Sequence, residues 1–139
     1  MSSGVEPAQA CIDAFQELKL KKTSKYIIYS LSKDLTEIIV EKKSPSTDYE
    51  EFLESLPEDE PRYAVVDVEY ELEGGAGKRS KIAFITWIPG LAKIKQRMVY
   101  ASSKDALKKS LQGIQVEVQA TDLDEAKREN IIEKLKRLR

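Results

Sequence analysis

Four cations recur at helical spacing between Arg97 and Lys109, and their types and spacing are suited to binding an anionic partner. Arg97, Lys104 and Lys108 are seven and four residues apart, so a helix places them on one strip, with Lys109 beside it. We call these four residues the basic stripe. Like charges four residues apart cost a helix a few tenths of a kcal/mol. The stripe is therefore either a solvated helix face or a surface kept for an anionic partner, and its spacing alone does not separate these readings.

The helix that must carry the basic stripe is predicted to span Met98–Gly113. Ala, Met, Leu and Lys are good helix formers, and Gly113 stands where a C-terminal cap belongs. Met98, Leu107 and Leu111 fall towards the other side of this helix. The stripe is thus predicted to lie on one side of a long amphipathic helix.

The charges of the chain are segregated along the sequence, although the formal net charge is only −1. Residues 48–73 contain eleven carboxylates against Arg62 alone, whereas residues 78–109 contain nine cations against Asp105 alone. We expect a basic side and an acidic side, which would orient the molecule on a charged partner. The near-zero total argues against a general nucleic-acid binder, so we expect no nucleic-acid partner.

The chemistry of most enzymes is missing from this sequence. It contains no histidine, one cysteine and no GxxxxGK[ST] or GxGxxG motif, so the commonest general base, a zinc site and the usual phosphate-binding loops are excluded. We therefore expect a binding module with no catalytic residues, no metal and no cofactor. Cys11 lies on the apolar side of a predicted helix and is expected to be a small core residue. A lone cysteine and the absence of a signal-like or membrane-spanning apolar run predict an intracellular protein.

The hydrophobic patterns predict one domain of 139 residues in the α/β (α+β) class, with a central mixed sheet of about five strands between helices. A helical crossover before the last strand predicts that this strand runs parallel to a neighbour. A capping pair, Asp122 with Glu125, is expected to start the terminal helix, whose buried side includes Leu123 and Leu138. The predicted elements are a mobile arm at 1–6, helices from Pro7 to Leu18, at Tyr49–Leu56, at Met98–Gly113 and at Asp122–Arg139, and strands at Tyr26–Leu31, Leu35–Glu41, Arg62–Leu72, Ile82–Ile88 and Ile114–Ala120.

The run Met98–Lys109, MVYASSKDALKK, is very similar to the signature of the actin-depolymerising factor/cofilin family. Other stretches resemble the same family in the same order, so that the resemblance covers nearly the whole chain. These stretches are Ala14-Phe15 with Leu18-Lys19, Tyr49–Phe52, Leu56-Pro57, Arg62–Ala64, Gly77–Ile82, Thr86-Trp87 and Gly113–Asp122. One departure is Trp87–Leu91, which replaces the Ser-Pro-Asp that follows the tryptophan in many members.

The resemblance implies a single ADF-homology domain that severs and depolymerises actin filaments, binds actin monomers and prefers ADP-actin. Monomeric and filamentous actin are then the expected partners, with phosphoinositide head groups as further ligands of the same cations. It also implies a monomer in the cytoplasm, at the actin cytoskeleton. Nuclear entry stays open, because the basic cluster of some animal members is reduced here to Lys19, Lys21 and Lys22. Two alternatives remain: a non-severing relative of coactosin or twinfilin type, and a phosphoinositide-binding adaptor.

Site residues follow from the resemblance position by position. The implied monomer-binding surface is Ser3, Gly4, Val5, Lys95, Arg97, Met98, Lys104, Lys108 and Lys109, and the implied phosphoinositide ligands are Lys95, Arg97, Lys104, Lys108 and Lys109. The implied additional filament contact is Arg79, Lys81, Glu133, Lys134 and Arg137. Ser3 occupies the inhibitory phosphorylation position of many members. Given the motif, we expect Met98 to contact a partner and Tyr100, Leu107 and Leu111 to lie in the core.

Overall fold

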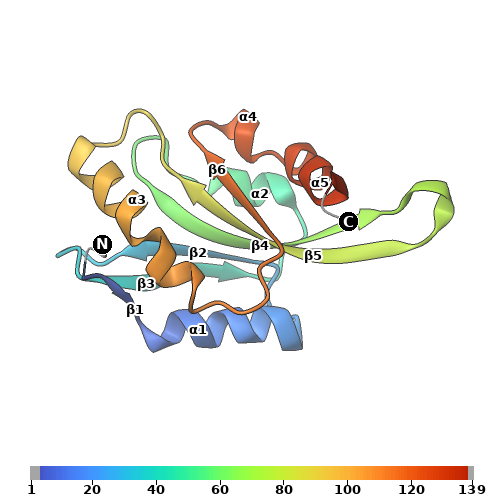
Figure 1. Cartoon of the computed structure of the whole chain (residues 1–139), viewed down its shortest axis with the longest axis horizontal. Coiled ribbons are helices and arrows are strands. Elements are labelled where there is room, and N and C mark those ends of the chain that lie inside the picture. The colour runs from blue at the N-terminus through green and yellow to red at the C-terminus, as the bar shows by residue number, and fades with distance from the viewer. Residues whose placement is uncertain (1–3, 138–139) are drawn as a thin grey trace.

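The computed structural model describes residues 4–137, and in this part of the chain helices cover both faces of one mixed sheet (Figure 1). The strands are β1 (Glu6–Pro7), β2 (Tyr26–Leu31), β3 (Glu37–Ser44), β4 (Arg62–Glu71), β5 (Lys78–Trp87) and β6 (Val116–Ala120). The helices are α1 (Gln9–Gln16), α2 (Tyr49–Glu54), α3 (Ile94–Lys108), α4 (Leu123–Ala126) and α5 (Arg128–Arg137), with a π-helical turn η1 (Glu17–Lys21) and a 3-10 turn η2 (Glu73–Gly75). The strand order is β1-β3-β2-β4-β5-β6.

The two faces of the sheet are packed by different helices, and each face has its own hydrophobic cluster. Cys11 and Phe15 of α1 and Leu107 of α3 pack with Ile27 and Phe84 on one face. On the other face, buried residues of α2, α4 and α5 pack against alternate strand residues. This alternation follows from the two-residue period of a strand. Consequently, α3 and α5 lie on opposite faces of the sheet, which matters for the surfaces described below (Figure 1).

Cys11 belongs to the core, as its place on the apolar side of the predicted helix indicated. Its side chain is fully buried, and its Sγ donates to the Ile38 carbonyl at 3.2 Å. Burial raises the pKa of the Cys11 thiol to about 11. The group is therefore a neutral thiol at physiological pH and behaves as a small hydrophobic residue.

The parallel pairing of the last strand is confirmed, and the sheet contains one more strand than expected. β6 pairs with β5 in parallel, with Ala83 opposite Val116. The additional strand is β1, in which Glu6 and Pro7 pair in parallel with Glu37 and Ile38. A strand of two residues, one of them a proline, is too short to show the alternation of apolar and polar residues that predicts a strand. On sequence grounds, Glu6 was therefore assigned to the mobile arm. That assignment was wrong for Glu6.

β4 and β5 extend beyond the rest of the sheet as a two-stranded ribbon (Figure 1). They pair along their whole length, whereas β2 pairs with β4 only as far as Val66 and β6 pairs with β5 only from Ala83. Positive φ angles of 70° at Gly74 and 111° at Gly77 allow the tight connection at the tip. The ribbon therefore projects side chains beyond the sheet edge.

α3 is displaced along the sequence from the predicted helix. Its N-cap, Lys93, has an extended backbone and makes no side-chain cap hydrogen bond, so no capping residue announced the start at Ile94. At the other end, α3 stops at Lys108, and Gly113, with φ of 115°, lies in the later turn that leads into β6. The expected cap role of Gly113 was wrong. A helix that starts at Ile94 brings Lys95 and Arg97 into its first turn.

The predicted terminal helix is divided in two. Asp122 caps α4 and accepts from the Glu125 amide at 2.9 Å, which confirms the expected capping pair. Lys127 then adopts an extended backbone, and α5 begins at the next residue. Because α4 is a separate short helix, Leu123 does not share the buried side of α5, and it is 49% exposed rather than buried as expected. Leu138 lies outside the described residues.

Two hydrogen-bonded carboxylates, Glu51 of α2 and Glu125 of α4, contribute to the expected response of stability to pH. Hydrogen bonds from Tyr26 and Ser44 hold the pKa of Glu51 below its ordinary value, and hydrogen bonds from Thr121 do the same for the pKa of Glu125. A carboxyl whose pKa is lowered by folding stabilises the protein above its unfolded pKa, and this contribution is lost as the pH falls through the folded pKa. With no histidine in the chain, we expect a nearly constant Tm between about pH 6 and pH 8 and a fall below roughly pH 4.3.

Thermal unfolding followed by circular dichroism across this pH range is the measurement. Glu51→Gln should lower the Tm at neutral pH and make the fall in acid shallower, because that carboxyl no longer titrates. A large change in Tm between about pH 6 and pH 8 would contradict the account.

Candidate protein-binding surfaces

Three large apolar side chains in and just before the first turns of α3 are exposed to solvent. Leu91, Ile94 and Met98 are 69%, 67% and 66% exposed. Ile94 and Met98 are four residues apart in α3 and so lie on one side of this helix, whereas Leu91 lies in the turn that precedes it. We call these residues the apolar strip. Exposed apolar groups that cluster in this way mark surfaces that bind other proteins. Sequence reasoning singled out Met98 alone, although the four-residue spacing of Ile94 from Met98 could have revealed the helical part of the strip.

The opposite side of α3 fixes the orientation of the apolar strip. Tyr100, Leu107 and Leu111 are buried, as expected. The Tyr100 hydroxyl accepts from the Leu31 amide at 2.9 Å, and the Tyr63 hydroxyl donates to the Tyr100 carbonyl. These contacts lock the rotation of α3 against the sheet, so the apolar strip faces outwards on a rigid element.

The implied cations of the first surface surround the apolar strip with unequal exposure. Lys95 and Lys109 are exposed, whereas Arg97, Lys104 and Lys108 are half-buried. Lys108 is also engaged within the protein, because its Nζ lies 2.6 Å from the Glu117 carboxylate on β6. The Glu117 hydrogen bond raises the pKa of Lys108, so this amine stays charged. Within the described part of the chain, the surface thus offers an anionic partner several cations without an ion pair, beside Lys108, which is already paired with Glu117.

The N-terminal residues implied in this surface differ in their exposure to solvent. Val5 is only 2% exposed and packs in the cluster beneath α1 and α3, so the expectation of an exposed Val5 contact was wrong. The adjoining strand β1 holds it there by its pairing with β3. Gly4 is exposed and lies shortly before that strand, which itself contacts α3. Ser3 falls outside the described residues.

A second candidate surface lies on the other face of the sheet, between the ribbon and α5. A groove of about 830 Å³ is lined there by Tyr70, Leu72, Arg79, Lys81, Leu135 and Lys136, among others. Arg79 pairs with Tyr70, and Lys81 pairs with Val68, which places both cations on the α5 side of the ribbon. The structure thus brings Arg79 and Lys81 together with the terminal helix, as the resemblance implied.

The remaining implied residues of this second surface lie on α5 beside the groove. Glu133, Lys134 and Arg137 are exposed, but they do not line it. Lys134 donates from its Nζ to the Glu117 carbonyl at 2.5 Å. Lys136, which does line the groove, was missed by sequence reasoning, because only folding places this residue opposite the ribbon.

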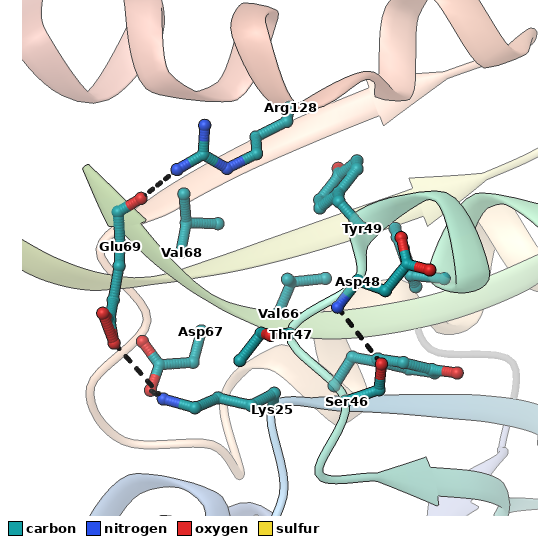
Figure 2. A pocket seen from close by; sticks show the side chains of 12 residues that line it. Lys25, Ser46, Thr47, Asp48, Tyr49, Val66, Asp67, Val68, Glu69 and Arg128 are labelled. Carbon is teal, nitrogen blue, oxygen red and sulfur yellow. Dashed lines mark hydrogen bonds and ion pairs between the residues drawn. The ribbon is translucent and has the colours of Figure 1, made fainter.

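A compact charged joint supports the base of the ribbon and the start of α5 (Figure 2). Asp67 is buried, and its carboxylate lies 3.7 Å from Lys25 Nζ and 3.6 Å from Lys22 Nζ. Lys25 also lies 3.5 Å from the Glu69 carboxylate, while Arg128 donates to the Glu69 carbonyl. Figure 2 shows Lys25, Asp67, Glu69 and Arg128 around a pocket of about 160 Å³. Its opposite charges neutralise each other, so we assign the joint a positioning role for the second surface.

The joint also shows that not every carboxylate of residues 48–73 contributes to the predicted acidic side. Asp67 is one of the carboxylates of residues 48–73, yet it is paired with lysines inside the fold instead of facing a partner. The run Glu58-Asp59-Glu60 is exposed, as a solvated loop should be.

Comparison with known proteins gives matches over almost the whole chain. Residues 4–136 match the family model described as "Cofilin/tropomyosin-type actin-binding protein". The chain is 56% identical to "Cofilin" of Mycosarcoma maydis over 137 residues, covering 99% of this chain and 98% of that protein. The crystal structure of Streptomyces griseoflavus cofilin superimposes with a TM-score of 0.91 at 54% identity, covering 96% of this chain and 98% of the other. Human coactosin-like protein has a TM-score of 0.78 at 21% identity, with 99% and 92% coverage, which shows a shared fold.

Proposed function

The chain belongs to the cofilin and actin-depolymerising factor family, and from this premise we propose that it binds actin monomers and filaments and severs and depolymerises the filaments. The proposal includes a preference for ADP-actin. It is carried by one observation: an exposed apolar strip stands among cations at the start of a rigid helix, and its last residue, Met98, begins the segment that resembles the family signature. Its cellular setting would be the cytoplasmic actin cytoskeleton.

The first surface is suited to an actin monomer that offers an apolar groove with acidic side chains nearby. Ile94 and Met98 would supply the buried anchors, because apolar side chains that enter a pocket carry most of the energy of an interface. Met is well suited to such a pocket, since its unbranched side chain adapts to irregular shapes. Lys95, Lys104 and Lys109 would add charge complementarity, which orients the partner and speeds encounter.

The second surface supports filament binding in addition to monomer binding. The groove between the ribbon and α5 lies on the other face of the sheet from α3 and carries Arg79 and Lys81. One molecule could then contact two successive actin subunits, which a single surface would not allow. Binding between subunits is the step from which severing follows.

Two alternatives place the same fold in other functions. A non-severing relative of coactosin or twinfilin type would use the fold without filament turnover, but identity to human coactosin-like protein is 21%, against 56% to a cofilin. A phosphoinositide-binding adaptor would use Lys95, Arg97, Lys104, Lys108 and Lys109 for head groups. In our proposal these lipids are competitors of actin for the same cations.

Ser3 would provide a switch for the first surface if a kinase modifies it. A phosphate adds about −1.5 to −2 charge at neutral pH. Beside a surface that attracts an acidic partner, this charge would repel that partner and lower its affinity.

The decisive experiment is fluorescence microscopy of ADP-actin filaments with the purified protein. The proposal predicts more and shorter filaments, together with co-sedimentation of the protein with the polymer. Filaments that keep their length at every ratio, while binding is retained, would favour the non-severing relative. Binding to phosphoinositide vesicles that added actin monomers leave unchanged, with no affinity for actin, would favour the adaptor.

A further inference from the structure

Glu117 is the one described residue bonded to both Lys108 of α3 and Lys134 of α5. It lies on β6, the edge strand of the sheet, in register with Phe84 of β5. Its carboxylate accepts from Lys108 Nζ at 2.6 Å, and its backbone carbonyl accepts from Lys134 Nζ at 2.5 Å. The side chain and the backbone of this residue therefore restrain cations that belong to the two different surfaces.

The ion pair with Glu117 distinguishes Lys108 from its neighbours. Across residues 4–137, none of the other implied phosphoinositide ligands forms an ion pair within 4.0 Å. The Lys108 and Glu117 side chains are 35% and 41% exposed, so an approaching anion can reach the pair and compete for it. The Lys108 amine is therefore fully available to an anionic partner only after that partner displaces the Glu117 carboxylate.

We propose that Glu117 is a built-in counter-ion that holds Lys108 on the protein and limits the attraction of the α3 surface for anionic partners. The inference rests on the proposed function and names a regulator of its first surface. An anion that approaches α3 must displace a carboxylate already in contact with the amine. Glu117 is thus a positioning residue that sets affinity, and its loss strengthens binding.

The substitution Glu117→Gln tests this role with little change of shape. The amide is close in size to the carboxylate but carries no charge, and the backbone carbonyl that binds Lys134 is retained. Exposed ion pairs of this kind are weak, so we expect a gain in affinity of roughly two- to fivefold at low salt, declining as salt is added. The probe is a phosphatidylcholine vesicle containing phosphatidylinositol 4,5-bisphosphate, with binding measured by co-sedimentation.

Glu129→Gln is the matched control, because it makes the same change in net charge at an exposed position on α5 that lies outside both implied surfaces. The proposal predicts a smaller gain for this control than for Glu117→Gln. It also predicts that adding Glu117→Gln to Lys108→Ala gives no larger gain than Glu129→Gln gives, because only the general charge effect then remains. Equal gains for the two glutamine variants, or a gain without Lys108 that exceeds that of Glu129→Gln, would overturn it.

The vesicle measurement contains no actin, so its result is independent of whether the protein binds actin. A protein that fails to bind actin but shows the Lys108-dependent gain would overturn the proposed function and leave the role of Glu117 standing. In the converse case, actin binding with no gain on vesicles for Glu117→Gln would overturn the counter-ion role alone. Circular dichroism melts of each variant verify that the fold is intact.

Discussion

Replacing Met98 by glutamate is expected to weaken the binding of ADP-actin monomers by about 2–4 kcal/mol, or roughly 30- to 1000-fold in Kd. Met98 is exposed and flanked by Ile94 on a helix whose rotation is locked by Tyr63 and Tyr100. A carboxylate at this position would have to lose its water to enter an apolar groove, and it would also repel an acidic partner. The measurement is a titration of fluorescently labelled ADP-actin monomers.

Leu20→Glu is the control for the Met98 prediction. Leu20 is 70% exposed, carries the same kind of apolar side chain and lies in η1, outside both candidate surfaces. Its replacement changes the charge equally, so monomer binding should stay within about twofold of the unmodified protein. If Met98→Glu and Leu20→Glu weakened binding equally, the apolar strip would not be the anchor.

The sequence predicted the strands well wherever a regular pattern repeats over several residues. β2 has the predicted bounds, and the parallel pairing of β5 with β6 follows from the helical crossover between them. The start of α3 was misplaced because Lys93 provides no side-chain cap, and β1 is too short to show alternation. The local hydrophobic pattern therefore predicted which helices and strands form. Where each element begins and ends depended on tertiary contacts, which the local pattern does not reveal.

The candidate surfaces were predicted less completely, for a different physical reason. A sequence motif identifies which residues belong to a surface. Whether each side chain is exposed or paired depends on the elements that pack against it in the folded protein. Val5 is buried in the cluster beneath α1 and α3, and Lys108 is paired with Glu117, although both had been assigned to one partner-binding surface. Conversely, Lys136 reaches the second groove only because α5 packs beside the ribbon.

Removing the two ribbon cations should separate filament binding from monomer binding. We expect Arg79→Ala with Lys81→Ala to weaken co-sedimentation with filaments roughly tenfold or more, while the Kd for monomers stays within about twofold. The two side chains point to the α5 side of the ribbon, on the face of the sheet opposite to α3. A monomer bound to the α3 surface would therefore leave them free, whereas a second subunit in a filament would contact them.

The matched control removes two cations from positions that do not line the groove. Lys78 pairs with Glu71 on the opposite face of the same ribbon, and Lys33 lies exposed in the loop between β2 and β3. Lys78→Ala with Lys33→Ala changes the net charge equally and should reduce filament binding far less, since only general attraction is lost. Equal losses in the two double variants would attribute the effect to net charge. Loss of monomer and filament binding together in Arg79→Ala with Lys81→Ala would mean that the ribbon belongs to the monomer contact, so that one actin subunit spans both faces of the sheet.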